Sequence, residues 1–145
     1  WLGFHEPLTT LDATRDWLSQ REAKWLLREE LGFCLRLRAT GAYLGSLDLH
    51  TIDWHTAFLA LGYWLRFGAE GHGYMCEAVQ TATGYAFNSL GIRQIGIRCD
   101  ARNTRSAAVA MRCGFTLEAR LRADHLAHDG VLADTLQFVK RAPSH

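Results

Sequence analysis

One short stretch of the chain has residue types and spacing that could bind an anion. It is "EGHGYMCEAV", residues 70–79, in which Gly71 and Gly73 precede a segment with helical spacing. The first backbone N–H groups of a helix have no partner within the helix and lie at the positive end of its dipole. Glycines let a phosphate approach those groups closely. The stretch is therefore a candidate phosphate site, although two glycines that only form a turn are an alternative interpretation.

Two familiar phosphate motifs do not fit this stretch. The dinucleotide fingerprint G-x-G-x-x-G needs a third glycine where the sequence has Cys76, and antiparallel strands are predicted before it. The P-loop motif needs Gly-Lys followed by Ser or Thr, which does not occur here. The sequence thus excludes both a Rossmann-type and a P-loop site.

The elements that would position this loop follow from hydrophobic spacing and turn residues. Segment 9–32 is predicted to be a helix, with a cap at Thr9, an apolar residue every seven positions on one face, and Gly32 as its end. The other predicted elements, in chain order, are strands at 33–38, 43–50 and 57–65, a helix at 73–90, a strand at 93–99, a helix at 103–113, and strands at 115–121 and 131–140.

This order predicts a single α/β domain over residues 1–145, with a mixed and mostly antiparallel sheet. The strand at 57–65 is apolar on both faces, which is typical of the middle of a sheet. The helix at 73–90 is long enough to be a crossover that joins it in parallel to the strand at 93–99. Because three antiparallel strands come first, a doubly wound parallel sheet is excluded.

The composition argues against several classes of function. Sixteen Lys and Arg residues oppose fifteen Asp and Glu, so the net charge of +1 offers no basic surplus for nucleic acid. No apolar run approaches the roughly 20 residues of a membrane helix. Four scattered cysteines without a Cys-x-x-Cys pair predict reduced thiols and a cytoplasmic location. The oligomeric state stays open, a homodimer included.

Two blocks of sequence at the right separation resemble the GCN5-related N-acetyltransferase (GNAT) superfamily. "GYWLRFGAEGHGYMCEAV", residues 62–79, is similar to its acetyl-CoA loop, Q/R-x-x-G-x-G/A after the fourth strand. "RCDARNTRSAAVAMRCGFTLEARLRADHLAHDG", residues 98–130, resembles the ribosomal-protein N-terminal acetyltransferases of the RimJ/RimL type. That branch has an Asn-x-x-Ser helix start, then Gly-Phe, then Leu-Glu, then an Asp-Gly turn. The resemblance covers about residues 11–140.

The resemblance implies an acetyl-CoA-dependent N-acetyltransferase whose acceptor is a primary amine, either a protein N-terminal α-amine or a small-molecule amine. It also implies one further strand and helix ahead of the first helix; because the chain begins at Trp1, we expect these to be missing. No metal is implied. The residues that the match assigns to acetyl-CoA binding are Trp64, Leu65, Arg66, Glu70, Gly71, His72, Gly73, Tyr74, Met75, Asn103 and Ser106.

Acetyl transfer needs a neutral amine and a proton for the departing thiolate. The match to the RimJ/RimL branch implies Glu118 as the base and Ser106 as the acid. The tyrosine that many members place four residues before Gly-Phe is replaced by Ala110. Structural alternatives exist for both residues: Ser106 could bond a backbone group at the helix start, and Glu118 could be an exposed strand residue.

The loop departs from the family pattern at two positions, and these departures support an alternative function. Glu70 stands where the pattern has Gln or Arg, and a carboxylate repels a pyrophosphate. Met75 stands where it has Gly or Ala, so we expect its side chain to crowd the approach. His72 replaces a frequent lysine. The alternative is an acyl-CoA-binding module with weak or no catalysis.

A group of acidic and histidine side chains near the end of the chain could suggest a metal site. Asp124, His125, His128 and Asp129 lie close together in sequence. Their place on a predicted hairpin turn favours solvated side chains, so no metal is expected.

Overall fold

The computed structural model describes residues 10–143. Its elements, in chain order, are α1 (Leu11–Leu26), β1 (Leu31–Arg36), β2 (Tyr43–Asp53), β3 (Phe58–Leu65), α2 (Tyr74–Asn88), β4 (Gln94–Asp100), α3 (Thr104–Arg112), β5 (Thr116–Leu126) and β6 (Leu132–Arg141). The predicted order of helices and strands is confirmed.

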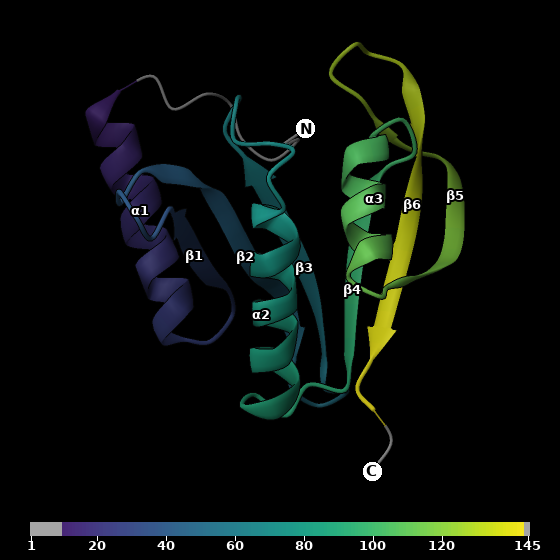
Figure 1. Ribbon diagram of the computed structural model, residues 1–145, viewed down its shortest axis with the longest axis horizontal. Helices are drawn as coiled ribbons and strands as arrows, with labels where there is room; N and C mark the ends of the chain where they lie inside the picture. Colours follow the sequence, from purple (N-terminus) through teal and green to yellow (C-terminus); the bar gives the residue numbers. More distant parts are fainter. Residues whose placement is uncertain (1–9, 144–145) are drawn as a thin grey trace.

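The six strands form one sheet in the order β1-β2-β3-β4-β6-β5 (Figure 1). Every neighbouring pair is antiparallel except β3 and β4, which are parallel and are joined through α2. This is the parallel pair that the sequence predicts. A crossover helix is needed there because neighbouring parallel strands cannot be joined by a tight turn.

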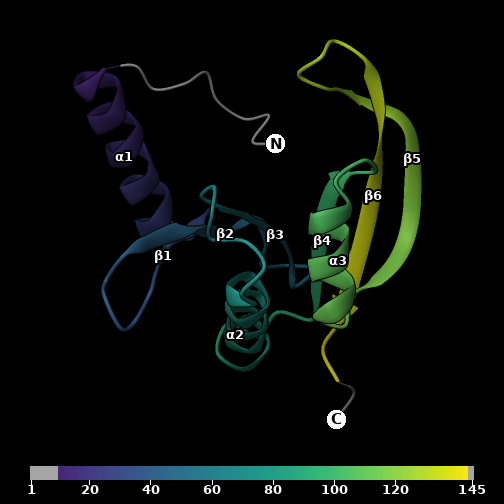
Figure 2. The ribbon, with the colours of Figure 1, turned by 45° about the horizontal axis from the view of Figure 1, so that its top comes forward.

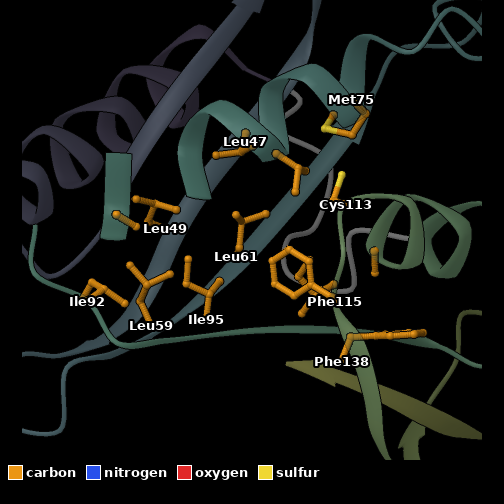
Figure 3. Packing of buried hydrophobic residues seen from close by; sticks show 14 of the residues in the cluster. Leu47, Leu49, Leu59, Leu61, Met75, Ile92, Ile95, Cys113, Phe115 and Phe138 are labelled. Carbon is orange, nitrogen blue, oxygen red and sulfur yellow. The ribbon is translucent and has the colours of Figure 1, made fainter. Parts of the chain in front are cut away.

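Helices cover both faces of the sheet (Figure 2). α2 and α3 lie on one face, and α1 lies on the other, over β1 and β2. The core sits under α2 and α3 (Figure 3). Its fully buried large side chains are Phe138, Leu47, Leu49, Leu59, Leu61, Ile92, Ile95, Ile97 and Val79. α1 contributes no buried residue, so its predicted apolar face is largely exposed.

The first helix is shorter than predicted at its C-terminal end. Its N-cap is Thr10, whose hydroxyl accepts from the Ala13 N–H at 3.1 Å, while Thr9 lies outside the described residues. The helix ends at Leu26, and Gly32 lies within β1 instead of ending the helix. The Arg21 guanidinium lies over Gly32, in the space that a side chain at that position would take.

Two strands continue further than predicted. β2 extends to Asp53 and β5 to Leu126, beyond the predicted ends at 50 and 121. Each passes a register shift, and each carries a residue with positive φ there, Thr51 at 50° and Ala123 at 48°. Such irregularities interrupt the alternation of side chains, which explains why hydrophobic spacing ended both strands early.

Candidate active site

The sheet parts between its two central strands. β3 and β4 pair only over Phe58–Ala60 and Gln94–Gly96, although β3 continues to Leu65 and β4 to Asp100. Beyond the paired residues the two strands diverge (Figure 1). We call this parting of β3 and β4 the splay. Backbone groups of β3 that face β4 have no ladder partner there, so they are available to a ligand.

The loop from β3 to α2 ends in a helix start with free donors. Gly73 is the N-cap of α2, with φ of 81° and no side chain capping the helix. Gly68 and Gly71 also have positive φ, and a Cβ atom at any of these three glycines would meet nothing within 4 Å. The first N–H groups of α2 therefore have no side-chain cap, and the glycines before them leave the loop uncrowded. This geometry suits the phosphate site that the sequence predicts.

The Glu70 carboxylate folds back onto its own loop. Its Oε2 accepts from the Gly68 N–H at 2.7 Å, and its Oε1 lies 3.8 Å from Nη1 of Arg105 in α3. The backbone N–H groups of Glu70 itself and of Gly68 lower the pKa of this carboxyl group. Glu70 thus occupies one loop donor and one nearby cation, as a bound anion would.

Met75 does not crowd the loop, contrary to the expectation from sequence. Its side chain is 4% exposed and belongs to the buried cluster that includes Cys113 (Figure 3). Only its backbone lies at the helix start. The rings of His72 and Tyr74 stack on each other next to the loop, with centroids 5.3 Å apart and planes 13° apart.

The residues predicted at the end of β3 hold the approach to the loop in place. The Trp64 ring contacts Tyr43 edge to face at 5.9 Å. The Arg66 backbone N–H donates to the Leu44 carbonyl at 2.8 Å, and Leu65 packs against the core. Their backbone therefore borders the splay while their side chains fix β3 to β2.

Ser106 lies in the splay, on the first turn of α3. Asn103 caps this helix by accepting from the Ser106 N–H at 3.1 Å. The Ser106 hydroxyl donates to the phenol oxygen of Tyr63 at 3.1 Å, and the phenol donates to the Ser106 carbonyl at 3.0 Å. Ser106 thus bonds across the splay to β3, and not to a backbone group of its own helix start.

Tyr63 is the residue of this site that sequence reasoning missed. Burial raises the pKa of its phenol above the ordinary value, so the phenol stays protonated. The available signal was the alternation in β3, where Leu59, Leu61 and Tyr63 share the inward face. The phenol comes from β3 and not from the position of Ala110, which is fully buried in α3.

Glu118 is not brought to Ser106. It lies at a bulge near the start of β5, and its Oε1 accepts from Nη1 of Arg141 at 2.5 Å. Arg141 in turn pairs with Gln94, at the end of the sheet where β3 and β4 are still joined. Ser106 therefore lies on α3 in the splay, whereas the Glu118 carboxylate of β5 lies against Arg141 of β6.

The acidic and histidine side chains near the β5–β6 turn make specific contacts. Asp100, whose side chain is fully buried, accepts from Arg102 Nη2 at 3.0 Å and is 3.1 Å from His125 Nε2. Arg102 also donates to Asp129 at 2.9 Å. The Arg102 guanidinium holds the pKa of Asp100 at about 2. Within residues 10–143, no three His, Cys, Asp or Glu side chains are grouped to hold a metal.

Two further features are the state of the cysteines and the character of the helices. All four cysteines are free. No helix in the described part of the chain has the length and apolar character needed to cross a membrane.

Known proteins have similar sequences or similar folds. A Bacillus subtilis protein, the candidate ribosomal N-acetyltransferase YdaF, is 30% identical over 143 residues, covering 95% of this chain and 74% of that protein. The microcin C7 self-immunity acetyltransferase MccE, solved in complex with acetyl-CoA and AMP, has a TM-score of 0.82 at 24% identity, covering 92% of this chain and 73% of that one. Spermidine N-acetyltransferase from Vibrio cholerae, solved with CoA and spermine, has a TM-score of 0.83 at 17% identity, covering 95% and 79%.

The family match agrees with the fold. Residues 1–116 match the family described as acetyltransferase (GNAT) domain, which is most of the 145-residue chain. The two structural likenesses extend over the mixed sheet that contains the splay. The chain therefore belongs to the acetyltransferase (GNAT) domain family.

Proposed function

We propose that the protein transfers the acetyl group of acetyl-CoA to a primary amine, the α-amine of a protein N-terminus. The observation that carries this proposal is the splay, which has free helix-start donors at one side and the Ser106 hydroxyl, held by Tyr63, within it. The similarity to a candidate ribosomal N-acetyltransferase supports a protein N-terminus as acceptor.

The loop before α2 would hold the pyrophosphate of acetyl-CoA. Its glycines leave the first N–H groups of the helix open, and the dipole favours an anion there. Arg105, which now pairs with Glu70 at 3.8 Å, is 83% exposed and within reach of the same loop. A bound pyrophosphate would compete with Glu70 for this guanidinium.

Ser106 would return a proton to the CoA thiolate. Its hydroxyl donates to Tyr63, and the protonated phenol keeps the serine side chain in one orientation. A thiol with an ordinary pKa near 8.5 leaves tolerably without help, so this contribution is modest. β3 backbone N–H groups without ladder partners are the donors available to a developing oxyanion.

The assignment of Glu118 as the base stays a prediction. Its carboxylate would have to leave Arg141 to accept a proton from the amine. The acceptor also bears on this step: a free α-amine, with a pKa of about 7.7–8.0, loses its proton far more easily than an alkylamine at about 10.4. A peptide N-terminus therefore asks less of any base than a polyamine does.

Glu70 favours a second candidate, an acyl-CoA-binding module with little catalysis. A carboxylate that already binds the Gly68 N–H and Arg105 competes with the cofactor for both groups, whether or not acetyl transfer takes place.

The free thiols fit a reducing compartment for either candidate, and we propose the cytoplasm.

An acceptor panel tests the proposal. The protein is incubated with acetyl-CoA and with hexapeptides that have a free N-terminus, N-terminally blocked lysine hexapeptides, or spermidine. CoA release is followed with a thiol reagent and the products by mass spectrometry. We expect acetylation of the free N-termini first. Binding of acetyl-CoA without any acetylated product would favour the binding module, and acetylation of spermidine alone would replace the peptide acceptor.

A further inference from the structure

Asp48 lies between two glycines on the face of the sheet opposite α2 and α3. Gly32 of β1 and Gly62 of β3 are its direct partners in the two neighbouring strands. A Cβ atom at Gly62 would lie 3.0 Å from Asp48 Oδ2 and 3.4 Å from His50 Nε2. The carboxylate and the imidazole therefore face bare β3 backbone, because no side chain at Gly62 intervenes.

This bare backbone borders the splay. His50 pairs with Ala60, and Ala60 is the last β3 residue that pairs with β4. Gly62 is therefore in the part of β3 that has parted from β4. Successive side chains of a strand point to opposite faces, so Gly62 and Tyr63 lie at one level on opposite sides of the sheet. Asp48 and His50 thus approach from one face the splay that Ser106 occupies from the other.

The imidazole of His50 is held at one nitrogen and open at the other. Nδ1 is 2.9 Å from Thr51 Oγ1, whereas Nε2 is 3.8 Å from Asp48 Oδ2, which is too long for a hydrogen bond. Thr51, a β-branched residue, has a φ of 50° at the irregular stretch of β2 before Asp53. Backbone strain of this kind gathers at functional sites. With the Nδ1 proton donated to Thr51, Nε2 presents a lone pair beside Gly62.

The charges around Asp48 leave room for a cation. Its side chain is 25% exposed, and burial raises the pKa of this carboxyl group, an effect that His50 and Arg21 oppose and Glu30 increases. Arg21 itself is taken by Glu30 at 2.7 Å. No hydrogen bond reaches the Asp48 carboxylate from any residue between 10 and 143. An ammonium group would supply one.

A groove leads to this position from α1. It is lined by Leu18, Arg21, Glu22, Trp25, Glu30 and Gly32. Gly32 is next to Asp48 in the sheet, and the Arg21 guanidinium lies over Gly32 at the end of the groove. Leu18 and Trp25 give the groove an apolar wall. Glu30 is paired with Arg21 and Lys24, which leaves the Glu22 carboxylate for the positive end of an extended chain.

We propose that Asp48 and His50 form the acceptor site of the acetyl transfer, in which Asp48 binds the ammonium group and His50 takes its first proton. The inference rests on the proposed function, because it names residues for the same reaction. It gives His50 the role that family resemblance assigns to Glu118.

Acetyl transfer at this site begins with a proton transfer from the bound ammonium group. The ammonium transfers one proton to Nε2 of neutral His50, which releases it to solvent after the reaction. The neutral amine nitrogen attacks the thioester carbonyl carbon, so that a C–N bond forms and the C–S bond breaks. The second nitrogen proton passes to water as the amide forms, and Ser106 protonates the thiolate and regains that proton from the same water. The sum is an amide, a thiol and one released proton.

The test measures acceptor and cofactor separately. An alanine-initiated hexapeptide amide is titrated into the protein–CoA complex by calorimetry, and kcat and KM are determined with acetyl-CoA. The variants are Asp48→Asn, His50→Gln and Gly62→Ala, with His55→Gln as a matched control on an exposed turn.

Each variant has its own expected result. Asp48→Asn should raise the peptide Kd and KM about 10-fold or more, the range of a lost charged hydrogen bond. His50→Gln should lower kcat by about 10²–10⁴-fold at pH 7 with little change in peptide Kd. Gly62→Ala should raise the peptide Kd because its methyl group fills the space between the two side chains. All three should keep the acetyl-CoA Kd, and His55→Gln should change nothing.

The outcomes separate the two proposals. Wild-type acetylation with unchanged peptide Kd and kcat in all three variants would overturn this inference and leave the proposed function standing. Losses that follow the acetyl-CoA Kd or the melting temperature would overturn it too, because they indicate a structural role. Peptide binding that depends on Asp48 without any acetyl transfer would support the site and reject the proposed function. If Glu118→Gln lowers kcat by about 10²–10⁴-fold and His50→Gln does not, Glu118 is the base.

Discussion

Replacing Glu70 with glutamine tests how the loop before α2 handles an anion. The glutamine amide oxygen can still accept from the Gly68 N–H, which Glu70 now does at 2.7 Å, so the loop should keep its shape. The negative charge is lost, and Arg105 of α3 loses its partner. Both changes favour a pyrophosphate, because one repulsion disappears and one guanidinium becomes available.

The size of the effect follows from exposure. Arg105 is 83% exposed and Glu70 36% exposed, so neither interaction gains from a low dielectric. An exposed ion pair contributes up to about 1 kcal/mol. One repulsion removed and one cation freed should therefore tighten acetyl-CoA binding by roughly 5–30-fold in Kd.

Calorimetric titration of wild type, Glu70→Gln, Arg105→Gln and the double variant with acetyl-CoA measures this gain. It should shrink with added salt, since exposed charges are screened, and it should be smaller when Arg105 is already replaced. An unchanged or weaker Kd in a Glu70→Gln variant that melts like wild type would refute the reasoning, because Glu70 and the pyrophosphate would then not compete.

Further substitutions test the framework of the site. Tyr63→Phe removes the oxygen to which Ser106 donates, and it should lower kcat about 3–10-fold with no further loss on adding Ser106→Ala, as steady-state kinetics will measure. Asp100→Asn should cost about 3 kcal/mol of unfolding free energy at pH 7. Because folding lowers the pKa of Asp100 from 3.8 to about 2, its contribution is complete above pH 4 and is lost as pH falls towards 2, so urea denaturation curves of the two proteins should converge over that range. Gly73→Ala should lower the free energy of unfolding by about 1–2 kcal/mol and weaken acetyl-CoA binding, because φ is 81° there. Gly84→Ala, in the middle of α2, should instead raise the free energy of unfolding by about 0.5–1 kcal/mol in the same urea denaturation experiments. Equal effects at both positions would contradict the assignment of Gly73 as the helix cap.

The order of elements and the parallel strand pair could be predicted because they depend on local signals. Apolar residues recur with helical or strand spacing, and the glycines at 73 and 114 end or begin helices in both sequence and structure. The end of the first helix could not be predicted, because Gly32 has the residue type that commonly ends a helix. Its actual role depends on a contact with Arg21, which lies eleven positions earlier and packs over it.

The helix-start parts of the site were similarly open to prediction, whereas its cross-strand parts were not. The loop glycines and the Asn103 cap are motifs of a few adjacent residues. Tyr63 meets Ser106, and Asp48 meets Gly62, only through the register of strands and the packing of α3. Whether Met75 points to the loop or the core depends on which side of α2 meets the sheet, and a single sequence position does not determine this.

Calorimetric titration of the wild-type protein with acetyl-CoA measures whether the splay and the loop before α2 bind this cosubstrate. We expect saturable binding at one site per chain with a Kd at or below about 1 mM, weakened by salt and by Gly73→Ala. We also expect the same complex to acetylate a peptide with a free N-terminus. No heat at millimolar acetyl-CoA would contradict both the acetyltransferase and the binding module, and would leave the splay without its proposed ligand.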